Sequence, residues 1–476
     1  MQNGVMVGRR GTDRDPAGDA RRVVIVGASV VGLLAAAACA DSARSVTVLE
    51  RDGPPSSRAP RRGVPQGSQP HVYLYRGLLA LEEMLPGICA ELHEAGAVSL
   101  DTGDLAWLGE TGWAPPGRRE FEILSITRPL FEHVLRRRVA GLPGVRIREE
   151  SRVEGLHRGD SSGARWSVQL AEGQVVSTDL VIDASGRGSR LPAWLQQLGF
   201  GPALVSEVDP RIGYATREYA VPPGAVGPAG VVVLRTPETQ TGGLGLPVEQ
   251  GRWLVTATGS GDRRPPRDPE AFEAFIAALR DDALAEVVGV AEPIGDVSIH
   301  RQTGNRRHHY ERLQRWPAGL LVLGDALCAF DPVYGQGVTV AACEALILRA
   351  ALQRGLRLCS ERRLLRRFAR VAALPWAIAT SEDRRYPSCE GEPSVHEALL
   401  GRWTQELGRL AGHGDPRAQA AMSRVYHLMG SPLLLFQPQL VAASVRSRLR
   451  GYGPATARPT ILTGPVDEKV RDSMLV

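Results

Sequence analysis

The chain has 476 residues, of which 43% are hydrophobic and 23% charged, a balance typical of a globular protein of two or three structural units. Its net charge of +5 comes almost entirely from arginine, because Lys469 is the single lysine. The arginines are scattered and often stand beside Asp or Glu, which argues against a nucleic-acid partner. The six cysteines form no CxxC pair and no metal spacing, so we predict reduced thiols, a cytoplasmic location and no metal site.

The chain opens on a polar segment followed by a strand–helix–strand pattern. Residues 1–20 lack the apolar core of a signal peptide, so we expect a disordered tail there. From Arg22 to Arg51, an apolar run, a glycine-containing turn, an Ala-rich run and a second apolar run follow one another. This order predicts the βαβ unit of dinucleotide-binding folds. Glycines interrupt the uncharged stretch 23–40, so no membrane span is expected.

Gly27, Ser29 and Gly32 stand where a dinucleotide-binding turn needs small residues. The first would allow the tight turn, the second would let the backbone approach a pyrophosphate, and the third would permit close packing of the helix. Ser29 replaces the usual glycine, which weakens the motif. Glu50, about 20 positions further on, would accept hydrogen bonds from ribose hydroxyls of FAD or NAD, or would be a solvated acid at a strand end.

The next part of the chain predicts a long loop and then mixed elements. The Pro- and Arg-rich segment 52–77 is too long for a simple connection, which is typical of a functional loop. Helical patterns follow near 77–96, and a hairpin is expected near 98–122. A helix with a basic face is predicted over 128–140, and strands with a hairpin over 144–184.

Beyond residue 210 the patterns change again. Alternating runs over 211–260 predict an antiparallel sheet. Residues 266–289 form one interrupted helix or a helix pair, and 361–447 show helical patterns with Pro and Gly breaks. The polar, Pro-rich segment from about 450 to 476 is expected to be a tail.

The segment 320–343, LLVLGDALCAFDPVYGQGVTVAAC, suits a ligand with a polyol chain and a polarisable ring. A strand-like run ends in Gly324 and Asp325, and the carboxylate would be presented to hydroxyl groups. Gly335, Gln336 and Gly337 then open a helix whose free N–H groups would face developing negative charge. Earlier in the chain, Asp183 ends another apolar strand before a loop of small residues and arginine, although a surface acid in a turn is the simpler alternative for it.

Together these three spaced elements resemble the flavoprotein monooxygenases of the para-hydroxybenzoate hydroxylase fold. VIDASGRGS and GLLVLGDALCAFDPVYGQGVTVAAC are similar to the family's second and third FAD motifs. RRGVPQGSQPHVYLYRG, ITRPLFEHVL, NRRHHYERLQRWPAGLLVLGDA and RRYPSC resemble an actinobacterial subgroup that includes polyether olefin epoxidases and related flavoprotein cyclases. The resemblance covers about residues 21–450.

The resemblance implies an α/β fold with three parts. A Rossmann-type FAD-binding domain would comprise 21–190 and 301–355, with 65–122 partly lining the substrate side. An antiparallel-sheet substrate domain would comprise 191–300. A helical region would follow at 356–450, before a tail at 451–476.

The resemblance also implies roles for individual residues. Gly27, Ser29 and Gly32 would contact the pyrophosphate of a tightly bound FAD, and Glu50 would hold the ribose. The remaining candidates are Arg51, Arg62 and Arg128 for the phosphates and flavin edge, Asp183, Gly324 and Asp325 for the pyrophosphate and ribityl chain, and Pro332, Gly335, Gln336 and Gly337 for the isoalloxazine ring.

One departure concerns the loop that carries two histidines in the subgroup. Gln69 occupies the first place, and His71 remains as the single candidate for proton handling or substrate positioning. A hydrogen-bonded structural histidine is an equal alternative. The catalytic residues are otherwise not identifiable from the sequence.

Three functions follow from the resemblance. The leading one is an NAD(P)H- and O2-dependent monooxygenase, an epoxidase or hydroxylase, that transfers oxygen from a flavin C4a-hydroperoxide to a hydrophobic, polyketide-like substrate. The alternative is a FAD-containing cyclase that closes a polyene by [4+2] addition without consuming oxygen. The third is a flavin carrier without turnover. Halogenation is not expected, because flavin halogenases use an active-site lysine and Lys469 stands near the C-terminus.

Overall fold

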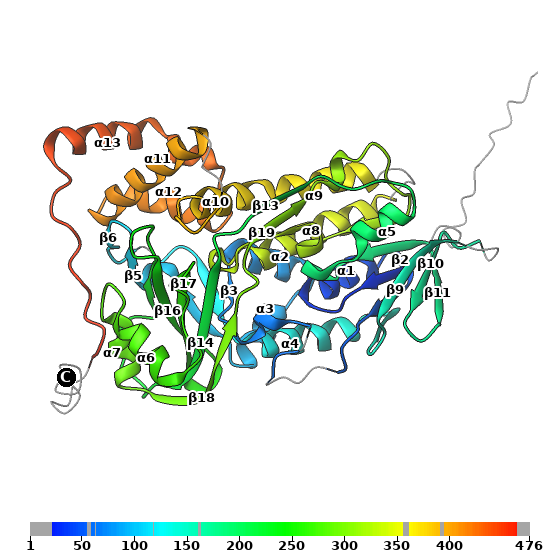
Figure 1. Cartoon of the computed structure of the whole chain (residues 1–476), viewed down its shortest axis with the longest axis horizontal. Coiled ribbons are helices and arrows are strands. Elements are labelled where there is room, and N and C mark those ends of the chain that lie inside the picture. Colours follow the sequence, from blue (N-terminus) through cyan, green and yellow to red (C-terminus); the bar gives the residue numbers. More distant parts are fainter. Residues whose placement is uncertain are drawn as a thin grey trace, which may run out of the picture.

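The computed structural model describes residues 21–54, 59–61, 63–117, 119–159, 163–355, 361–390 and 395–463. The predicted tail at 1–20 and the candidate Arg62 lie outside these residues. The elements within them form a parallel sheet with helices, a larger antiparallel sheet, and a cluster of helices near the C-terminus (Figure 1).

A five-stranded parallel sheet has the order β20-β12-β1-β2-β8. Its strands in chain order are β1 (Arg21–Val26), β2 (Ala43–Leu49), β8 (Val145–Arg148), β12 (Leu180–Asp183) and β20 (Leu320–Val322). Their short apolar runs are buried because helices cover the sheet. The order puts the strands of all three predicted motifs side by side, so the turns after them meet at one edge. The predicted Rossmann-type α/β fold is confirmed.

Helix α1 (Val30–Ala40) packs against α4 (Arg128–Ala140) and α8 (Gly337–Gln353). Its alanines allow this close approach on several sides, and nine of its residues are buried. Gly32 lies tightest, because a Cβ built on it would stand 1.8 Å from the carbonyl oxygen of Gly27. The helix therefore begins directly against the turn that precedes it.

A seven-stranded sheet has the order β18-β14-β17-β16-β15-β5-β6. The strands are β5 (Ala106–Gly109), β6 (Gly112–Trp113), β14 (Ile212–Ala220), β15 (Val231–Val233), β16 (Thr241–Pro247), β17 (Arg252–Ser260) and β18 (Glu292–His300). All neighbours are antiparallel except β15 and β5. The antiparallel sheet predicted over 211–260 is confirmed, and part of the hairpin expected near 98–122 extends it.

Two short helices cover one face of this sheet. They are α6 (Pro269–Ala277) and α7 (Ala283–Gly289), so the predicted interrupted helix is a helix pair. Phe272 and Leu284 are fully buried from the helix side, and Ala215 and Val255 from the sheet side. This second core is separate from the core around the parallel sheet.

Three smaller sheets complete the set of described strands. They are β3-β7-β4, with Val72–Tyr73, Glu122–Ser125 and Val98–Asp101; β11-β10-β9, with Val175–Thr178, Trp166–Leu170 and Val153–Arg158; and β13-β19-β21, with Val205–Val208, Asn305–His308 and Cys328–Ala329. Three further helices pack into the core around the parallel sheet: α2 (Tyr75–Met84), α3 (Ile88–Glu94) and α5 (Leu191–Gln197).

The C-terminal region is helical, as predicted. It comprises α9 (Glu361–Val371), α10 (Ala373–Asp383), α11 (Val395–Gly412), α12 (Pro416–Tyr426) and α13 (Pro438–Arg450). After α13, residues 451–463 run along one edge of the molecule toward α7 (Figure 1).

Part of the predicted tail is packed against the antiparallel half. Ile461 is 1% exposed within the second core, and Leu462 forms a β-bridge with Val226. Arg458 makes ion pairs with Asp281 and Glu286 beside α7. The expectation of a free tail is wrong for these residues, because the apolar Ile461 finds a buried position that local composition does not reveal.

We predict that Gly32→Ala destabilises the protein by at least about 3 kcal/mol, because the new methyl group would overlap the Gly27 carbonyl. Gly408→Ala within α11 is the matched control, since its Cβ would meet only ordinary contacts at 3.8 Å or more. The control variant is expected to be neutral or slightly stabilising. Urea unfolding of both variants measures the difference, and equal stabilities would contradict the packing described for α1.

Candidate functional site

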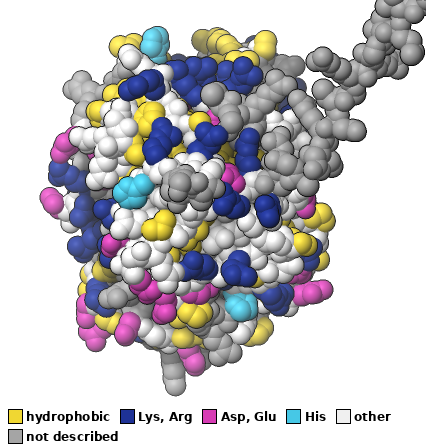
Figure 2. Space-filling model, turned by 90° about the vertical axis from the view of Figure 1, so that its right-hand side faces the viewer, with side chains coloured by type: hydrophobic (Ala, Val, Ile, Leu, Met, Phe, Trp, Pro, Cys, Tyr) yellow, Lys and Arg dark blue, Asp and Glu magenta, His cyan; other side chains and the backbone are white. Residues whose placement is uncertain are grey.

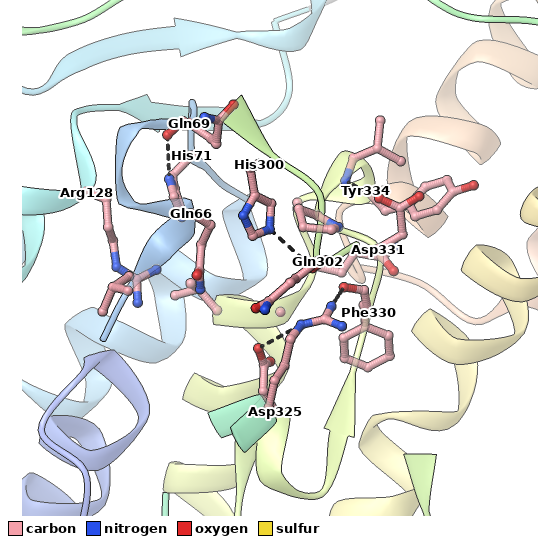
Figure 3. A pocket seen from close by; sticks show the side chains of 18 of the residues that line it. Gln66, Gln69, His71, Arg128, His300, Gln302, Asp325, Phe330, Asp331 and Tyr334 are labelled. Atoms are coloured by element: carbon pink, nitrogen blue, oxygen red, sulfur yellow. Dashed lines mark hydrogen bonds and ion pairs between the residues drawn. The ribbon is translucent and has the colours of Figure 1, made fainter. Parts of the chain in front are cut away.

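A cavity of about 1330 Å³ extends from the parallel sheet to the antiparallel sheet and the C-terminal helices. Gly27 and Glu50 line it at one end, Asp325 and Gln336 in the middle, and Val232 and Tyr426 at the other. Figure 3 shows the middle part, where His71 and Arg128 lie opposite Asp331 and Tyr334. Pockets for one drug-sized ligand span roughly 300–1,000 Å³, so this cavity has room for a cofactor and a second molecule.

The glycine turn forms the first end of the cavity. Gly27 has φ +98°, and a Cβ there would lie 2.6 Å from the carbonyl oxygen of Ala184, so only glycine suits the position. Ser29 precedes α1 without capping it, because its hydroxyl instead donates to Glu132 at 2.6 Å. The first N–H groups of α1 are therefore available to an anionic ligand.

A buried network of charges lies beside this turn. Arg61 pairs with Glu50 at 3.0 Å and with Glu132 at 2.8 Å, and its side chain is 6% exposed. Arg128 also pairs with Glu132, at 2.8 Å, and donates to the Ser29 hydroxyl at 3.0 Å. Burial by itself would raise the pKa of Glu132, but the charges of Arg128 and Arg61 lower it to about 2. The cluster is thus ionised and holds the loop before residue 63 against α4.

The carboxylate of Glu50 accepts hydrogen bonds from the backbone on both of its oxygens. The donors are the N–H groups of Ala28 at 2.8 Å and Asp52 at 3.1 Å. A carboxylate has about four lone-pair positions, so one remains for a ribose hydroxyl beside the bond from Arg61. Arg51 also lines the cavity, with a largely exposed side chain.

Asp183 does not line the cavity, although the sequence suggested that it binds the cofactor. Its side chain is fully buried and accepts hydrogen bonds from the hydroxyls of Ser185 and Ser189. Burial raises its pKa despite these bonds. Its contribution is to shape the following loop, of which Ser185, Gly186, Arg187 and Gly188 do line the cavity.

Gly324 and Asp325 divide their roles in a similar way. Gly324 has φ +61° and makes the turn, and a Cβ there would meet Val31 at 2.7 Å. Asp325 lines the cavity, and Arg187 lies 3.8 Å from its carboxylate. Arg187 also donates to the carbonyl groups of Gly304 and Phe330. The guanidinium is therefore fixed by two carbonyl groups beside Asp325, and both side chains line the cavity.

The turn before α8, residues 331–336, also lines the cavity, and we call it the ring-binding turn after the role that the sequence predicts. A 3-10 turn over Pro332–Tyr334 leads to Gly335, which has φ +64°. Gln336 is 1% exposed and lines the cavity, and neither polar atom of its side chain has a hydrogen-bond partner among the described residues. Buried amides without partners are costly, so this side chain indicates a missing ligand. Gly337 begins the helix beside it.

Glu344 supports this region from within α8. Its carboxylate accepts a hydrogen bond from the Gly324 N–H at 2.8 Å, and the side chain is fully buried. Burial raises the pKa of Glu344 to about 8. The group is therefore largely protonated near neutral pH.

His71 is neutral and fixed in one tautomer. Its Nδ1 lies 2.8 Å from the Gln69 carbonyl oxygen, which can only accept, so Nδ1 carries the hydrogen and Nε2 is the free acceptor. Burial and the nearby Arg128 lower the pKa of His71 to about 3. Burial also lowers the pKa of His300, which lies across the pocket (Figure 3).

Gln69, which replaces the first histidine of the loop, binds the antiparallel sheet. Its Oε1 accepts a hydrogen bond from the Thr216 hydroxyl at 2.6 Å, and its Nε2 donates to the Ser298 carbonyl at 3.4 Å. The side chain is 5% exposed. It therefore ties the loop to β14 and β18.

A second buried polar cluster stands at the far side of the ring-binding turn. Arg235 pairs with Asp331 at 3.4 Å and with Asp383 at 3.2 Å, and both carboxylates are fully buried. Tyr214 donates to Asp331 at 2.8 Å, and Tyr334 donates to Asp383 at 2.9 Å. Burial, and then the charge of Asp331, raise the pKa of Asp383 well above its usual range.

The end of the cavity beyond this cluster is mainly apolar. Its walls come from the seven-stranded sheet, from β7 and from the C-terminal helices, through Trp107, Ile123, Val232, Leu244, Leu246, Ile378, Met422 and Tyr426. Such a lining suits a hydrophobic molecule next to the ring-binding turn.

The residues fit FAD along the whole cavity. The glycine turn and α1 suit a pyrophosphate, Glu50 and Asp325 suit hydroxyl groups, and the unpartnered Gln336 suits the polar edge of a flavin ring. The cavity thus joins Gly27, Ser29, Glu50, Arg51, Arg128, Asp325, Pro332, Gly335, Gln336, Gly337 and His71. Three further predicted residues do not line the cavity but shape the turns beside it: Gly32, Asp183 and Gly324. Sequence reasoning missed Arg61, Glu132, Arg187 and Arg235, because nothing local distinguishes them from the many other charged residues.

Comparisons with known proteins agree with this architecture. The family model "Tryptophan halogenase" matches residues 124–199. Protein Rv3254 of Mycobacterium tuberculosis is 31% identical over 480 residues, covering 94% of this chain and 96% of that protein. Kynurenine 3-monooxygenase of Salinispora tropica is 27% identical over 353 residues, covering 70% of this chain and 72% of that enzyme.

Two solved structures share the fold. A flavoprotein/dehydrogenase from Cytophaga hutchinsonii has a TM-score of 0.63 at 16% identity, covering 90% of this chain and 99% of that one. The Diels-Alderase PyrE3 of the pyrroindomycin pathway has a TM-score of 0.57 at 21% identity, covering 86% of this chain and 81% of that one. The arrangement of the two large sheets around one cavity is thus the fold of FAD-dependent monooxygenases. Within that fold class, the chain belongs to the family of protein Rv3254.

We predict that the free energy of unfolding falls less with rising pH in Glu344→Gln than in the natural protein. The carboxyl's pKa is raised from 4.5 to about 8 on folding, so its contribution is full below 4.5 and declines up to 8. The decline has an upper limit of about 1.4 kcal/mol per pH unit. Glutamine keeps the acceptor for Gly324 and does not titrate.

Urea unfolding at several pH values across that window measures the effect. The free energy of unfolding of the variant, relative to that of the natural protein, should increase steadily as the pH rises. Glu154→Gln, at an exposed position on β9, is the control and should shift stability little. A stability difference between Glu344→Gln and the natural protein that does not vary with pH would contradict a buried, protonated Glu344.

Proposed function

We propose that this protein is a cytoplasmic, FAD-dependent monooxygenase, an epoxidase or hydroxylase, that acts on a hydrophobic, polyketide-like substrate and takes electrons from NADH or NADPH. The observation that carries the proposal is the single cavity, which joins the dinucleotide turn, the ring-binding turn and an apolar chamber. A flavin carrier without turnover would not need the chamber. The resemblance of the loops to a subgroup that includes polyether olefin epoxidases supports the substrate class.

When bound, FAD would supply the electron transfer and the activation of oxygen, and the chain's residues would do the rest. The glycine turn and the free N–H groups of α1 would bind the pyrophosphate, and Asp325 would hold hydroxyls of the ribityl chain. The N–H groups at the start of α8 and the Gln336 amide would stabilise negative charge at the ring's polar edge.

The chamber's residues would orient the substrate and exclude water. Its apolar wall removes solvent from the reacting centre, which protects reactive species from hydrolysis. His71 is neutral, so it would act as a hydrogen-bond acceptor through Nε2 and not as a cationic acid. His300 stands opposite it and is likewise held neutral by burial. Epoxidation requires no nucleophile from the protein.

A second candidate is a FAD-containing cyclase that catalyses a [4+2] closure of a polyene without consuming oxygen. The observation that favours it is Gln69, whose side chain is committed to Thr216 and the Ser298 carbonyl and therefore cannot relay protons. In this case FAD would shape the chamber, and the same apolar walls would fold the polyene. Fold similarity to a Diels-Alderase is compatible with this reading.

Anaerobic mixing of the purified holoprotein with NADH or NADPH tests the redox proposal. With a polyene or polyketide-like substrate present, we expect the flavin absorbance to bleach and to recover when oxygen is admitted. Oxygen uptake should then match product formation one to one. A flavin that stays oxidised while product forms would refute the monooxygenase and support the cyclase.

We predict that Glu50→Gln weakens FAD binding at least about tenfold, because a neutral amide is a poorer acceptor for a ribose hydroxyl and for Arg61. Quenching of FAD fluorescence on titration with apoprotein measures the affinity. Glu149→Gln is the matched control, since Glu149 pairs with Arg136 nearby but does not line the cavity. Thermal unfolding of the apoprotein checks that both variants fold. Equal affinity in a folded Glu50→Gln variant would contradict the assigned ribose site.

A further inference from the structure

An apolar stripe runs along the outer side of α13. Val441, Val445 and Leu449 are 44%, 54% and 82% exposed. Their spacing of four residues places them on one face of the helix. In Figure 1 this helix lies at the upper edge of the molecule, with α11 and α12 below it. Exposed apolar rows of this kind mark surfaces that contact another apolar phase.

The stripe is not the face that holds the helix to the protein. Leu440 is fully buried in the core of the C-terminal helices, and Ser444 donates to Glu406 of α11 at 2.7 Å. These residues lie on the opposite side from Leu449 at 100° per residue. The apolar stripe therefore is not needed to pack α13 against the protein.

Arginines flank the stripe on both sides. Arg446 and Arg450 follow one border and Arg448 the other, by the same helical spacing, and all three are exposed. Arg448 pairs with Glu406, whereas Arg446 and Arg450 have no ion pair among the described residues. The sequence contains no Asp or Glu from 431 to 458. The face thus combines apolar and cationic groups with no nearby exposed acid of its own segment.

The short turn before α13 extends the apolar surface. Leu433 and Phe436, in the 3-10 helix Pro432–Phe436, are 74% and 50% exposed. Both precede α13 directly in the chain. Together with the stripe they form what we call the α13 surface, which comprises Leu433, Phe436, Val441, Val445, Leu449 and the three flanking arginines.

A second basic face lies on α9. Its buried side is formed by Leu364, Leu365 and Phe368, and its outer side carries Arg363, Arg366 and Arg370. No ion pair to these arginines occurs within the described parts of the chain. Helix α9 lies in the upper half of Figure 1, and Figure 2 shows arginines gathered near the top of the end that faces the viewer. Figure 2 faces the end of the molecule opposite α13, so the arginines seen there lie outside the α13 surface.

We infer that the α13 surface docks the protein on an anionic lipid bilayer. A helix with an apolar face bordered by arginines matches the interfacial boundary of such a bilayer, where the side chains enter the acyl region and the cations meet the headgroups. Pairing of two copies through this surface would bring like charges together, and a nucleic acid offers no acyl phase for the stripe. None of the helices in the described part of the chain combines the length and apolarity that crossing a bilayer requires.

The helical region that carries α13 also forms part of the wall of the apolar chamber. Helices α10 and α12 contribute Ile378, Met422 and Tyr426 to the apolar chamber, and α13 packs on α11 of the same helical region. A bilayer-bound enzyme would thus meet apolar substrates in the phase where they concentrate. The inference itself does not depend on which reaction the chamber catalyses.

Co-sedimentation of the full holoprotein with vesicles tests the inference. One set of vesicles contains phosphatidylcholine alone and the other phosphatidylcholine mixed with phosphatidylglycerol. We expect binding to the anionic vesicles, weakening with salt, and little binding to the neutral ones. Val441→Ser/Val445→Ser/Leu449→Ser should lower the partition coefficient at least about tenfold. Arg446→Ser/Arg450→Ser should lower it about fivefold for each arginine.

Two control variants carry the same changes elsewhere. Val175→Ser/Leu204→Ser alters two side chains that are 58% and 57% exposed, and Arg44→Ser/Arg267→Ser alters exposed arginines on other elements. Both should bind vesicles as the natural protein does. Absence of binding to anionic vesicles, or equal losses in the test and control variants, would overturn the inference. So would light scattering that shows a dimer dissolved by the triple serine change.

Discussion

The fold depends on one buried guanidinium that joins three parts of the chain. Arg235 follows β15 of the antiparallel sheet, Asp331 stands in the ring-binding turn before α8, and Asp383 ends α10. Breaking such a pair by removing one partner costs about 3–5 kcal/mol, because a charge is then left buried and uncompensated. The cluster therefore fixes how the cofactor-binding half, the antiparallel half and the C-terminal helices meet. The cavity between them takes its shape from this junction.

The network around Arg61 plays the same part at the other end of the cavity. Glu50 and Glu132 come from a strand end and from α4, and Arg61 comes from the long loop between them. Because the loop contributes a cation exactly where two carboxylates converge, its burial is compatible with an ionised site. One ionic cluster thus fixes the end of the cavity at the glycine turn, and the other fixes the part beside α8. The cavity beyond the second cluster is lined mainly by apolar residues.

The sequence predicted the parts of the site that depend on backbone pattern. Strand, glycine turn and helix start are local features, so Gly27, Asp325 and Gln336 could be assigned before their neighbours were known. The ion pairs could not, because Arg61 and Arg235 differ from dozens of other arginines only in what lies opposite them in space. Asp183 stands at the end of its strand as the pattern predicts, but the sequence did not show that the hydroxyls of Ser185 and Ser189 would bond its buried carboxylate away from the cavity. Likewise, Ile461 is apolar in a polar segment, and its partners are far away in the chain.

The burial of Ile461 has a consequence for how the protein is made. The core of the antiparallel half is built mostly from residues 106–299, yet its described members include Ile461. A ribosome delivers those strands long before it delivers the residue that completes their packing. The core around the parallel sheet is also completed late, because Leu320–Val322 and α8 are made after the antiparallel strands. The antiparallel half therefore cannot complete its core before residue 461 has been made, and its apolar strand surfaces must stay covered until then.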